Sequence, residues 1–270
     1  MSVINTNVSA LSAQNALKTN ARSMNTAMEQ LSTGSRVNSA KDDAAGLAIG
    51  QSMTTQVRGL NMAVRNVNDA VNMMQTAEGA MTEQSNMLQR MRELAVQSAS
   101  GTYSSTQRSY LDTEFKALVT QIGSIASQST WNGTTLMNAT STFSFQAGQA
   151  SGQTISVVVT SMGTASLGVS TASISSASIA STTIATLDTA INSINSQRAS
   201  IGAGINQMTY AADSMTNAAA NAAASRSTVM DTDYATASTQ LAKGQIIQQA
   251  ATAMLAQANQ QPQSVLALLK

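Results

Sequence analysis

The feature that most constrains this chain is a heptad pattern of apolar residues over residues 44–98. Apolar side chains recur there at alternating gaps of three and four residues, and one polar residue, Gln84, interrupts them. The pattern consists of Met53, Val57, Leu60, Val64, Val67, Val71, Met74, Ala77, Met81, Leu88, Met91 and Ala95. A 3.5-residue repeat of this length predicts a helix packed on a partner with the same repeat. The helix is roughly 80 Å long, which is longer than a compact globule of this chain length is wide, so we predict a rod.

A second long pattern predicts the partner of this helix. Its members are Ile184, Leu187, Ile191, Ile194, Arg198, Ile201, Ile205, Met208, Ala212, Met215, Ala219 and Ala222, and Arg198 is the one charged residue among them. We predict a helix of about 40 residues, or about 60 Å. A third helix is predicted over residues 105–127, with Leu111, Phe115, Leu118, Ile122 and Ile125 on one face. Its short connection makes it an antiparallel neighbour of the first.

The two ends of the chain carry shorter stripes. In residues 1–32, Val3, Ala10, Leu17, Met24 and Leu31 are seven residues apart, with Ala21 and Met28 between them. The final helix, predicted up to Pro262, carries Ala237, Leu241, Ile247, Ala251, Met254 and Ala258, and the tail adds Val265, Leu266, Leu268 and Leu269. The simplest arrangement pairs the two ends. We expect their packing to involve Leu17, Met24, Leu31, Ile247, Met254, Val265 and Leu268.

The middle of the chain predicts a small sheet and a loop. Apolar residues recur at every second position, first as Phe143, Phe145 and Ala147 and then as Ile155, Val157 and Val159. The stretch Gly148–Gly152 joins the two runs, which indicates a β-hairpin. Residues 160–183 are mostly Ser, Thr, Ala and Gly, and we predict a short, variable surface loop there. The predicted fold is therefore mainly α: a long antiparallel coiled-coil-like rod with one hairpin. Residues 1–43 and 226–270 form the paired terminal helices with their connectors, and residues 44–159 and 184–225 form the rod.

Composition narrows the possible functions. Charged residues are 10% of the chain and the net charge is +1, and no run of Lys or Arg is present, so nucleic-acid binding is poorly supported. The absence of Cys and His removes thiol chemistry and the commonest general base, so we expect no enzyme activity, metal or cofactor. Two classes remain: a self-assembling structural protein, and an amphipathic membrane-acting translocator. A translocator needs a long apolar hairpin segment, which the sequence does not contain.

Partner chains are the expected cover for the apolar stripes. Each buried Leu, Val or Met stabilises by roughly 1.5–3 kcal/mol, and thin helical pairs leave many of them in water. The first residues, MSVINTNVSALSAQ, lack the basic segment and apolar core of a secretory signal. We therefore expect no membrane insertion and, if the protein is exported, a route that reads no such signal.

Five segments resemble the bacterial flagellins. They are LSTGSRVNSAKDDAAGLAI at 31–49, QRMRELAVQSASGT at 89–102, WNGTTLM at 131–137, LDTAINSINSQRASIGAGIN at 187–206 and LAKGQIIQQAATAMLAQANQQPQSVLALL at 241–269. They follow the family's order and cover both ends and most of the chain. Residues 160–183 leave no room for the central outer domains of long flagellins, so the chain resembles a short form of the family.

This resemblance implies a structural subunit that assembles into the helical filament of the bacterial flagellum and serves motility. It implies an inner layer of paired terminal helices, an outer tube layer of long helices with the hairpin, and an extracellular location reached without a cleaved signal peptide. The implied partners are other copies of the chain, the filament cap and hook-junction proteins, an export chaperone at the C-terminal helix, and the host toll-like receptor for flagellin.

The resemblance also suggests individual positions. Gln89, Arg90, Leu94 and Glu114 match the pattern for receptor recognition, and the same face is a candidate subunit interface. The alternative is a solvated face with local ion pairs. Ser173, Ser176 and Ser178 are candidate O-glycosylation sites, and an undecorated flexible loop is the alternative. The family commonly has Glu where this chain has Ala237, so a charge pair made by that Glu elsewhere is in doubt here.

Overall fold

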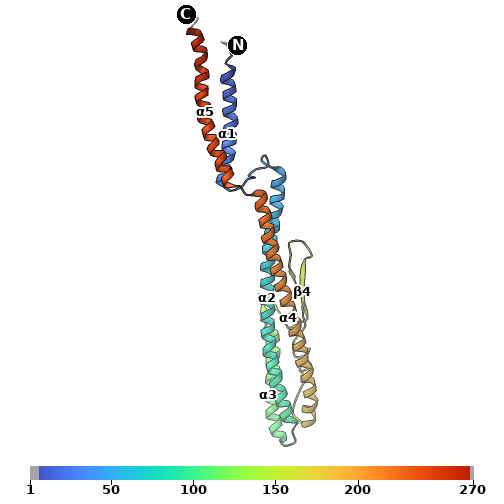
Figure 1. Ribbon diagram of the computed structural model, residues 1–270. Coiled ribbons are helices and arrows are strands. Elements are labelled where there is room, and N and C mark those ends of the chain that lie inside the picture. Colours follow the sequence, from blue (N-terminus) through green and yellow to red (C-terminus); the bar gives the residue numbers. More distant parts are fainter. Residues whose placement is uncertain (1–5, 268–270) are drawn as a thin grey trace. The chain divides into compact units, whose positions relative to one another are not determined.

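The computed structural model describes residues 6–267, with side chains described through Gln260. Within this range the helices are α1 (Val8–Thr33), α2 (Ala44–Ala99), α3 (Ser105–Gln128), α4 (Ala177–Met230) and α5 (Tyr234–Ala267). The strands are β1 (Thr130–Trp131), β2 (Thr134–Thr135), β3 (Ser141–Gln146) and β4 (Thr154–Val159) (Figure 1). Arg58–Ala219 is one compact unit, and Met1–Val57 with Ala220–Lys270 is the other. The prediction of a mainly α fold with a small hairpin is confirmed.

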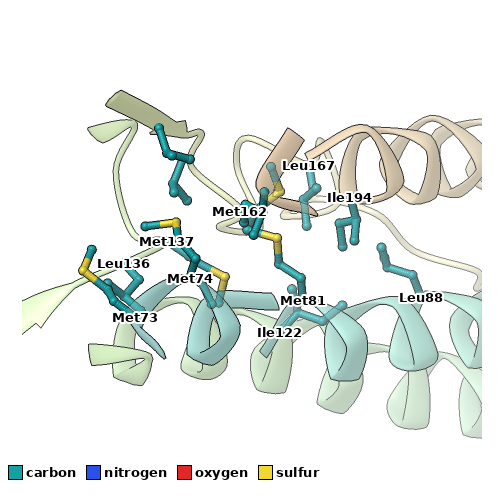
Figure 2. Packing of buried hydrophobic residues seen from close by; sticks show 14 of the residues in the cluster. Met73, Met74, Met81, Leu88, Ile122, Leu136, Met137, Met162, Leu167 and Ile194 are labelled. Carbon is teal, nitrogen blue, oxygen red and sulfur yellow. The ribbon is translucent and has the colours of Figure 1, made fainter. Parts of the chain in front are cut away.

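In the unit Arg58–Ala219, α2 packs on α3 and α4. Its predicted stripe is buried from Leu60 to Ala95, and Val64 and Val71 lie partly buried at its edge. Additional residues of α2, including Ala63, Ala70, Met73 and Leu94, are also buried. The buried face is wider than the predicted seam because two helices cover α2 from different sides. Figure 2 shows its side chains meeting Ile122 of α3 and Ile194 of α4.

Gln84, the polar break in the stripe, is fully buried and connects three segments. Its Nε2 donates to the carbonyl oxygens of Ile122 and Met162, both at 3.2 Å. A buried amide needs such partners to offset its lost hydration. The break in the heptad pattern is therefore a cross-link between α2, α3 and the segment after β4.

On α4, seven of the twelve predicted contact positions are buried: Leu187, Ile194, Ile201, Met208, Ala212, Met215 and Ala219. Ala190, Gln197 and Gly204 are buried at positions that the pattern did not include. The predicted residues Ile191, Arg198 and Ile205 lie at the edge. Strand β4 explains the difference, because a Cβ on Gly204 would lie only 2.9 Å from Val157 Cγ2. The close approach of β4 excludes a larger side chain at position 204, and Gln197 is buried because it donates a hydrogen bond to the backbone of the same strand.

Strands β3 and β4 form the predicted antiparallel hairpin, with Phe143 opposite Val157 and Phe145 opposite Ile155. The Gln197 side chain fixes the hairpin to α4, since its Nε2 donates to the Val158 carbonyl at 2.8 Å. A second, smaller pair, β1 with β2, closes through Asn132 and Gly133, whose φ angles are 48° and 79°. This turn suits Asn-Gly, because both positions need positive φ. Strands of two residues are too short to show alternation, so no period in the sequence indicates this pair.

The prediction of an exposed loop over residues 160–183 is wrong. The backbone is irregular up to residue 176, but α4 already begins at Ala177. Apolar side chains of the segment are buried in the core: Met162, Leu167, Val169, Ile174 and Ala180. Figure 2 shows Met162 and Leu167 directed toward Met81 and Ile194. The connector between the last two helices is short, because α4 extends to Met230 and α5 begins at Tyr234.

Candidate assembly and recognition surfaces

Helices α1 and α5, here called the terminal pair, lie side by side and antiparallel (Figure 1). Two asparagines, one at the start of α1 and one within it, donate hydrogen bonds to backbone carbonyls of α5. Asn7 Nδ2 donates to the Ala258 oxygen at 2.7 Å, and Asn20 Nδ2 donates to the Gly244 oxygen at 2.8 Å. Such amide bonds fix the register of a helix pair. The two ends of the chain therefore meet, as the simplest arrangement of the sequence predicts.

Small residues form the seam of the terminal pair. Ala10 and Ala27 of α1 and Ala237 and Gly244 of α5 are buried, and a Cβ on Gly244 would lie 3.5 Å from Met24 Cβ. Ala237, the position where the family commonly has Glu, is therefore an apolar seam residue. The small side chains let the two helices approach closely.

The predicted packing residues of the terminal pair are only partly correct. Leu17, Met24 and Leu31 are half-buried against the seam. Ile247 and Met254 are 38% and 65% exposed, so they do not pack between α1 and α5 of one chain, and their role in packing between chains stays a prediction. The face of α5 that contacts α1 carries the small residues, so the larger side chains of α5 point away from α1. The side chains of Val265 and Leu268 lie outside the described residues.

Large apolar side chains remain exposed on both helices of the terminal pair. They are Val8, Leu11 and Met28 on α1, and Ile246, Ile247 and Met254 on α5. Surface apolar residues are normal singly, but several on two adjacent helices mark an interaction surface. The terminal pair therefore presents apolar surface that is available to another chain.

Hydrogen bonds between the two connectors hold the end of α1 close to the start of α5. The Arg36 guanidinium donates to the Val229 carbonyl at 2.7 Å, and the Thr232 N–H donates to the Gly34 carbonyl at 3.0 Å. Gly34 has a φ of 72°, a conformation that favours glycine at the end of a helix. The hydroxyl and backbone N–H of Thr236 and the N–H of Ala235 bind Asp233 and lower the pKa of its carboxyl.

On the unit Arg58–Ala219, Arg90 lies between two carboxylates. Its guanidinium contacts Glu114 on α3 at 2.9 Å and Glu93 on α2 at 3.0 Å. The bond with Glu114, followed by that with Glu93, raises the pKa of Arg90. Gln89 is exposed beside it. The predicted positions Gln89, Arg90 and Glu114 thus share one surface.

Leu94 does not belong to this surface. Its side chain is 1% exposed and lies in the core with Phe115. The prediction that it contacts a receptor is contradicted by its burial, since a contact residue must reach the surface. The heptad pattern of α2 did not include Leu94, because the sequence does not reveal that two helices cover α2 here.

A buried carboxylate on α3 anchors the segment before α4, and sequence reasoning missed it. Asp112 Oδ1 accepts from the Ser173 hydroxyl and from the Ile174 N–H, both at 2.8 Å, and Lys116 lies 2.6 Å from Oδ2. Burial raises the pKa of Asp112, but the bonds from Lys116, Ile174 and Ser173 outweigh it and leave the pKa lowered. The available signal was an acidic residue three positions before Phe115, on the apolar face of the helix.

The three candidate glycosylation serines differ in their surroundings. Ser173 is half-buried and bound to Asp112, and Ser176 accepts from the Ile179 N–H at 3.3 Å near the start of α4. Ser178 is exposed. Of the three, Ser178 has the hydroxyl most accessible to an enzyme, and its modification remains a prediction.

The described residues include neither a metal-binding cluster nor a membrane-spanning helix. Between residues 6 and 267, no group of three acidic, His or Cys side chains is placed to hold a metal ion. No helix in the same range is both long and apolar enough to cross a membrane.

Long paired helices that leave large apolar side chains exposed define the class of the protein as a helical structural protein. The family model for the bacterial flagellin N-terminal helical region matches residues 4–142, and the model for the C-terminal helical region matches residues 184–269. The chain therefore belongs to the bacterial flagellin family, which confirms the resemblance seen in the sequence.

Similar proteins agree with this assignment. The flagellar filament 33 kDa core protein of Treponema phagedenis is 39% identical, over 99% of this chain and 100% of that protein. A flagellin of Halalkalibacterium halodurans is 38% identical over the same shares of both chains. Flagellin A of Vibrio anguillarum is 33% identical over 375 aligned positions, so it is longer and the present chain is a short form.

A solved structure supports the fold. The crystal structure of Bacillus cereus flagellin matches with a TM-score of 0.52 and 32% identity, over 56% of this chain and 88% of that one.

Proposed function

We propose that this chain is a structural subunit of the bacterial flagellar filament and that it polymerises through its terminal pair. The observation that carries the proposal is the exposed apolar surface of α1 and α5 in a chain of the flagellin family. Covering one such side chain stabilises a contact by roughly 1.5–3 kcal/mol. When identical copies make one heterologous contact whose rotation does not close a ring, an open helical polymer results.

The layers of the filament follow from this proposal. Residues 1–43 and 226–270 supply the inner layer, and residues 44–159 and 184–225 supply the outer tube layer. The compact units support a division of this kind, although their boundaries fall within α2 and α4, between Val57 and Arg58 and between Ala219 and Ala220. Residues 160–183 belong with the outer layer, because their apolar side chains pack in its core.

Further partners are proposed on the same surfaces. An export chaperone covers the exposed Ile246, Ile247 and Met254 of α5 before assembly, because such a face is costly to leave in water. The filament cap and hook-junction proteins contact the same terminal pair at the ends of the polymer. The extracellular location follows from a role in the filament.

The host toll-like receptor is proposed to contact the exposed surface that carries Gln89, Arg90 and Glu114. Leu94 supports this surface from below and does not contact the receptor. The support for the proposal is the ion pair that holds Arg90 and Glu114 across α2 and α3.

Electron microscopy of purified protein tests the main proposal. Full-length protein should form ordered filaments, and a variant truncated before Ala235 should form none while its core remains folded by circular dichroism. A matched pair of substitutions sharpens the test. Ile246→Gln with Ile247→Gln should weaken assembly, whereas Val158→Gln, at an exposed apolar residue of β4, should not. Normal filaments from the truncated variant, or liposome leakage without filaments, would contradict the proposal and favour the translocator alternative.

A further inference from the structure

Three methionines in the described part of the chain are exposed, and two of them lie on the terminal pair. Met28 of α1 is 52% exposed, Met254 of α5 is 65% exposed, and Met62 of α2 is 48% exposed. The methionines of the core are all buried: Met73, Met74, Met81, Met91, Met137, Met162, Met208 and Met215. The chain contains no cysteine, so thioether sulfur is the only sulfur available to an oxidant.

We propose that Met28 and Met254 are oxidation sites through which peroxide prevents assembly of the free subunit. A peroxide transfers one oxygen atom to the thioether sulfur: the O–O bond breaks and an S–O bond forms. The sulfur is oxidised to the sulfoxide, and hydrogen peroxide is reduced to water. The product is a polar group in place of a flexible apolar side chain.

The inference rests on the proposed function, because the two side chains matter only if neighbouring copies cover them. In the free subunit both side chains are more than half exposed, so a sulfoxide at either position can be hydrated and should leave the fold unchanged. In a filament the same sulfoxide must be buried, and a buried polar group without a partner is unfavourable. We expect each modified site to weaken the binding between neighbouring subunits about tenfold.

The core methionines provide an internal contrast. Met74, Met81 and Met91 are fully buried between helices, so peroxide reaches them only when the core opens. Met62 is exposed outside the terminal pair, and its sulfur accepts from the Arg65 guanidinium at 2.8 Å. Oxidation at Met62 should therefore occur without effect on the terminal pair.

The test titrates the free full-length subunit with hydrogen peroxide and follows each methionine by peptide mass spectrometry. Oxidation at Met28 and Met254 should raise the protein concentration needed for filament formation about tenfold or more. The double variant Met28→Leu with Met254→Leu should keep assembling after the same treatment, because leucine is apolar, similar in size and not oxidised. The matched control Met62→Leu should remain as sensitive as the unsubstituted chain. Methionine sulfoxide reductases for both sulfoxide epimers should restore assembly.

A second measurement uses the unsubstituted protein alone. Met28 and Met254 should oxidise much more slowly in preformed filaments than in free subunits, because a covered thioether reacts only when the contact opens. Equal rates in the two states, or normal assembly of subunits fully oxidised at both sites, would overturn the inference. Failure of the untreated protein to form filaments would instead overturn the proposed function, and this inference with it.

Discussion

At the residue scale, Arg90 and Leu94 lie one helical turn apart on α2 and have different roles. Arg90 is bound at the surface by two carboxylates, whereas Leu94 is part of the core. A loss of receptor binding at Leu94 therefore needs a different explanation from a loss at Arg90.

Substitution separates these roles. Leu94→Ala should lower the free energy of unfolding by about 2–5 kcal/mol, because it removes buried methyl groups and leaves a cavity. Arg90→Ala should leave the urea unfolding midpoint nearly unchanged, because exposed ion pairs contribute little, but it should weaken receptor signalling by free subunits. Urea denaturation and a receptor reporter assay measure the two effects. Unchanged signalling by a folded Arg90→Ala subunit would remove Arg90 from the receptor surface.

Asp112 should make the stability of the unit Arg58–Ala219 depend on pH in the acid range. Its pKa is lowered in the folded chain, so its contribution is complete above the unfolded pKa and is lost as pH falls through the folded pKa. Stability should therefore decrease as the pH is lowered below about 4–5. Asp112→Asn should reduce stability at pH 7 and flatten this acid limb, whereas Asp213→Asn, at an exposed position of α4, should not. Urea midpoints between neutral and acid pH provide the measurement, and parallel curves for Asp112→Asn and the unsubstituted chain would contradict the assignment.

At the element scale, helix α4 carries two glycines with opposite surroundings. A Cβ on Gly202 would meet nothing within 4 Å, whereas a Cβ on Gly204 would meet Val157 of β4 at 2.9 Å. Gly202→Ala should stabilise by about 0.5–1 kcal/mol through helix propensity. Gly204→Ala should lack this gain and be about 1 kcal/mol or more less stable than Gly202→Ala, because the strand must move. Equal unfolding free energies for the two variants would show that the hairpin does not pack closely on α4.

The turn between β3 and β4 is the element that tolerates added length. Ala150 and Ser151 are exposed, so a Gly/Ser insertion of about ten residues between them should cost under about 1 kcal/mol. The same insertion after Ser173 should destabilise strongly, because it separates the two groups that bind Asp112, the Ser173 hydroxyl and the N–H of the buried Ile174. Thermal unfolding of both variants decides this, and equal melting temperatures would show that the segment before α4 is not anchored.

How far the sequence predicts each element depends on whether its contacts repeat. The helix α2, the helix α3 and the hairpin follow from regular periods of 3.5 and 2. The packing of Met162, Leu167 and Ile174 does not, because isolated apolar residues in a Ser/Thr-rich stretch carry no period. The exposure of Ile247 and Met254 was also missed, because apolar residues at heptad spacing predict a seam without showing that Ala237 and Gly244 form it.

At the scale of the whole molecule, the two compact units should differ in local stability. The terminal pair has a seam of small residues and an exposed apolar surface, whereas Arg58–Ala219 has a continuous core of large side chains. In free subunits, amides of residues 8–33 and 234–260 should exchange with solvent faster than those of the core, and polymerisation should slow them. Hydrogen exchange followed by mass spectrometry measures both states. Slow exchange at both ends in a verified monomer would show that the pair is stable without neighbours.

The two asparagine bonds across the terminal pair make its tolerance to mutation asymmetric. Asn7 and Asn20 donate from side chains, so nearly any replacement on α1 loses the bond. Their acceptors are main-chain oxygens, which every amino acid carries, so the identity of residue 258 is not constrained by the bond that it accepts. Over evolutionary time, register can therefore be inherited through a few positions near the start of the chain while the facing side of α5 diverges.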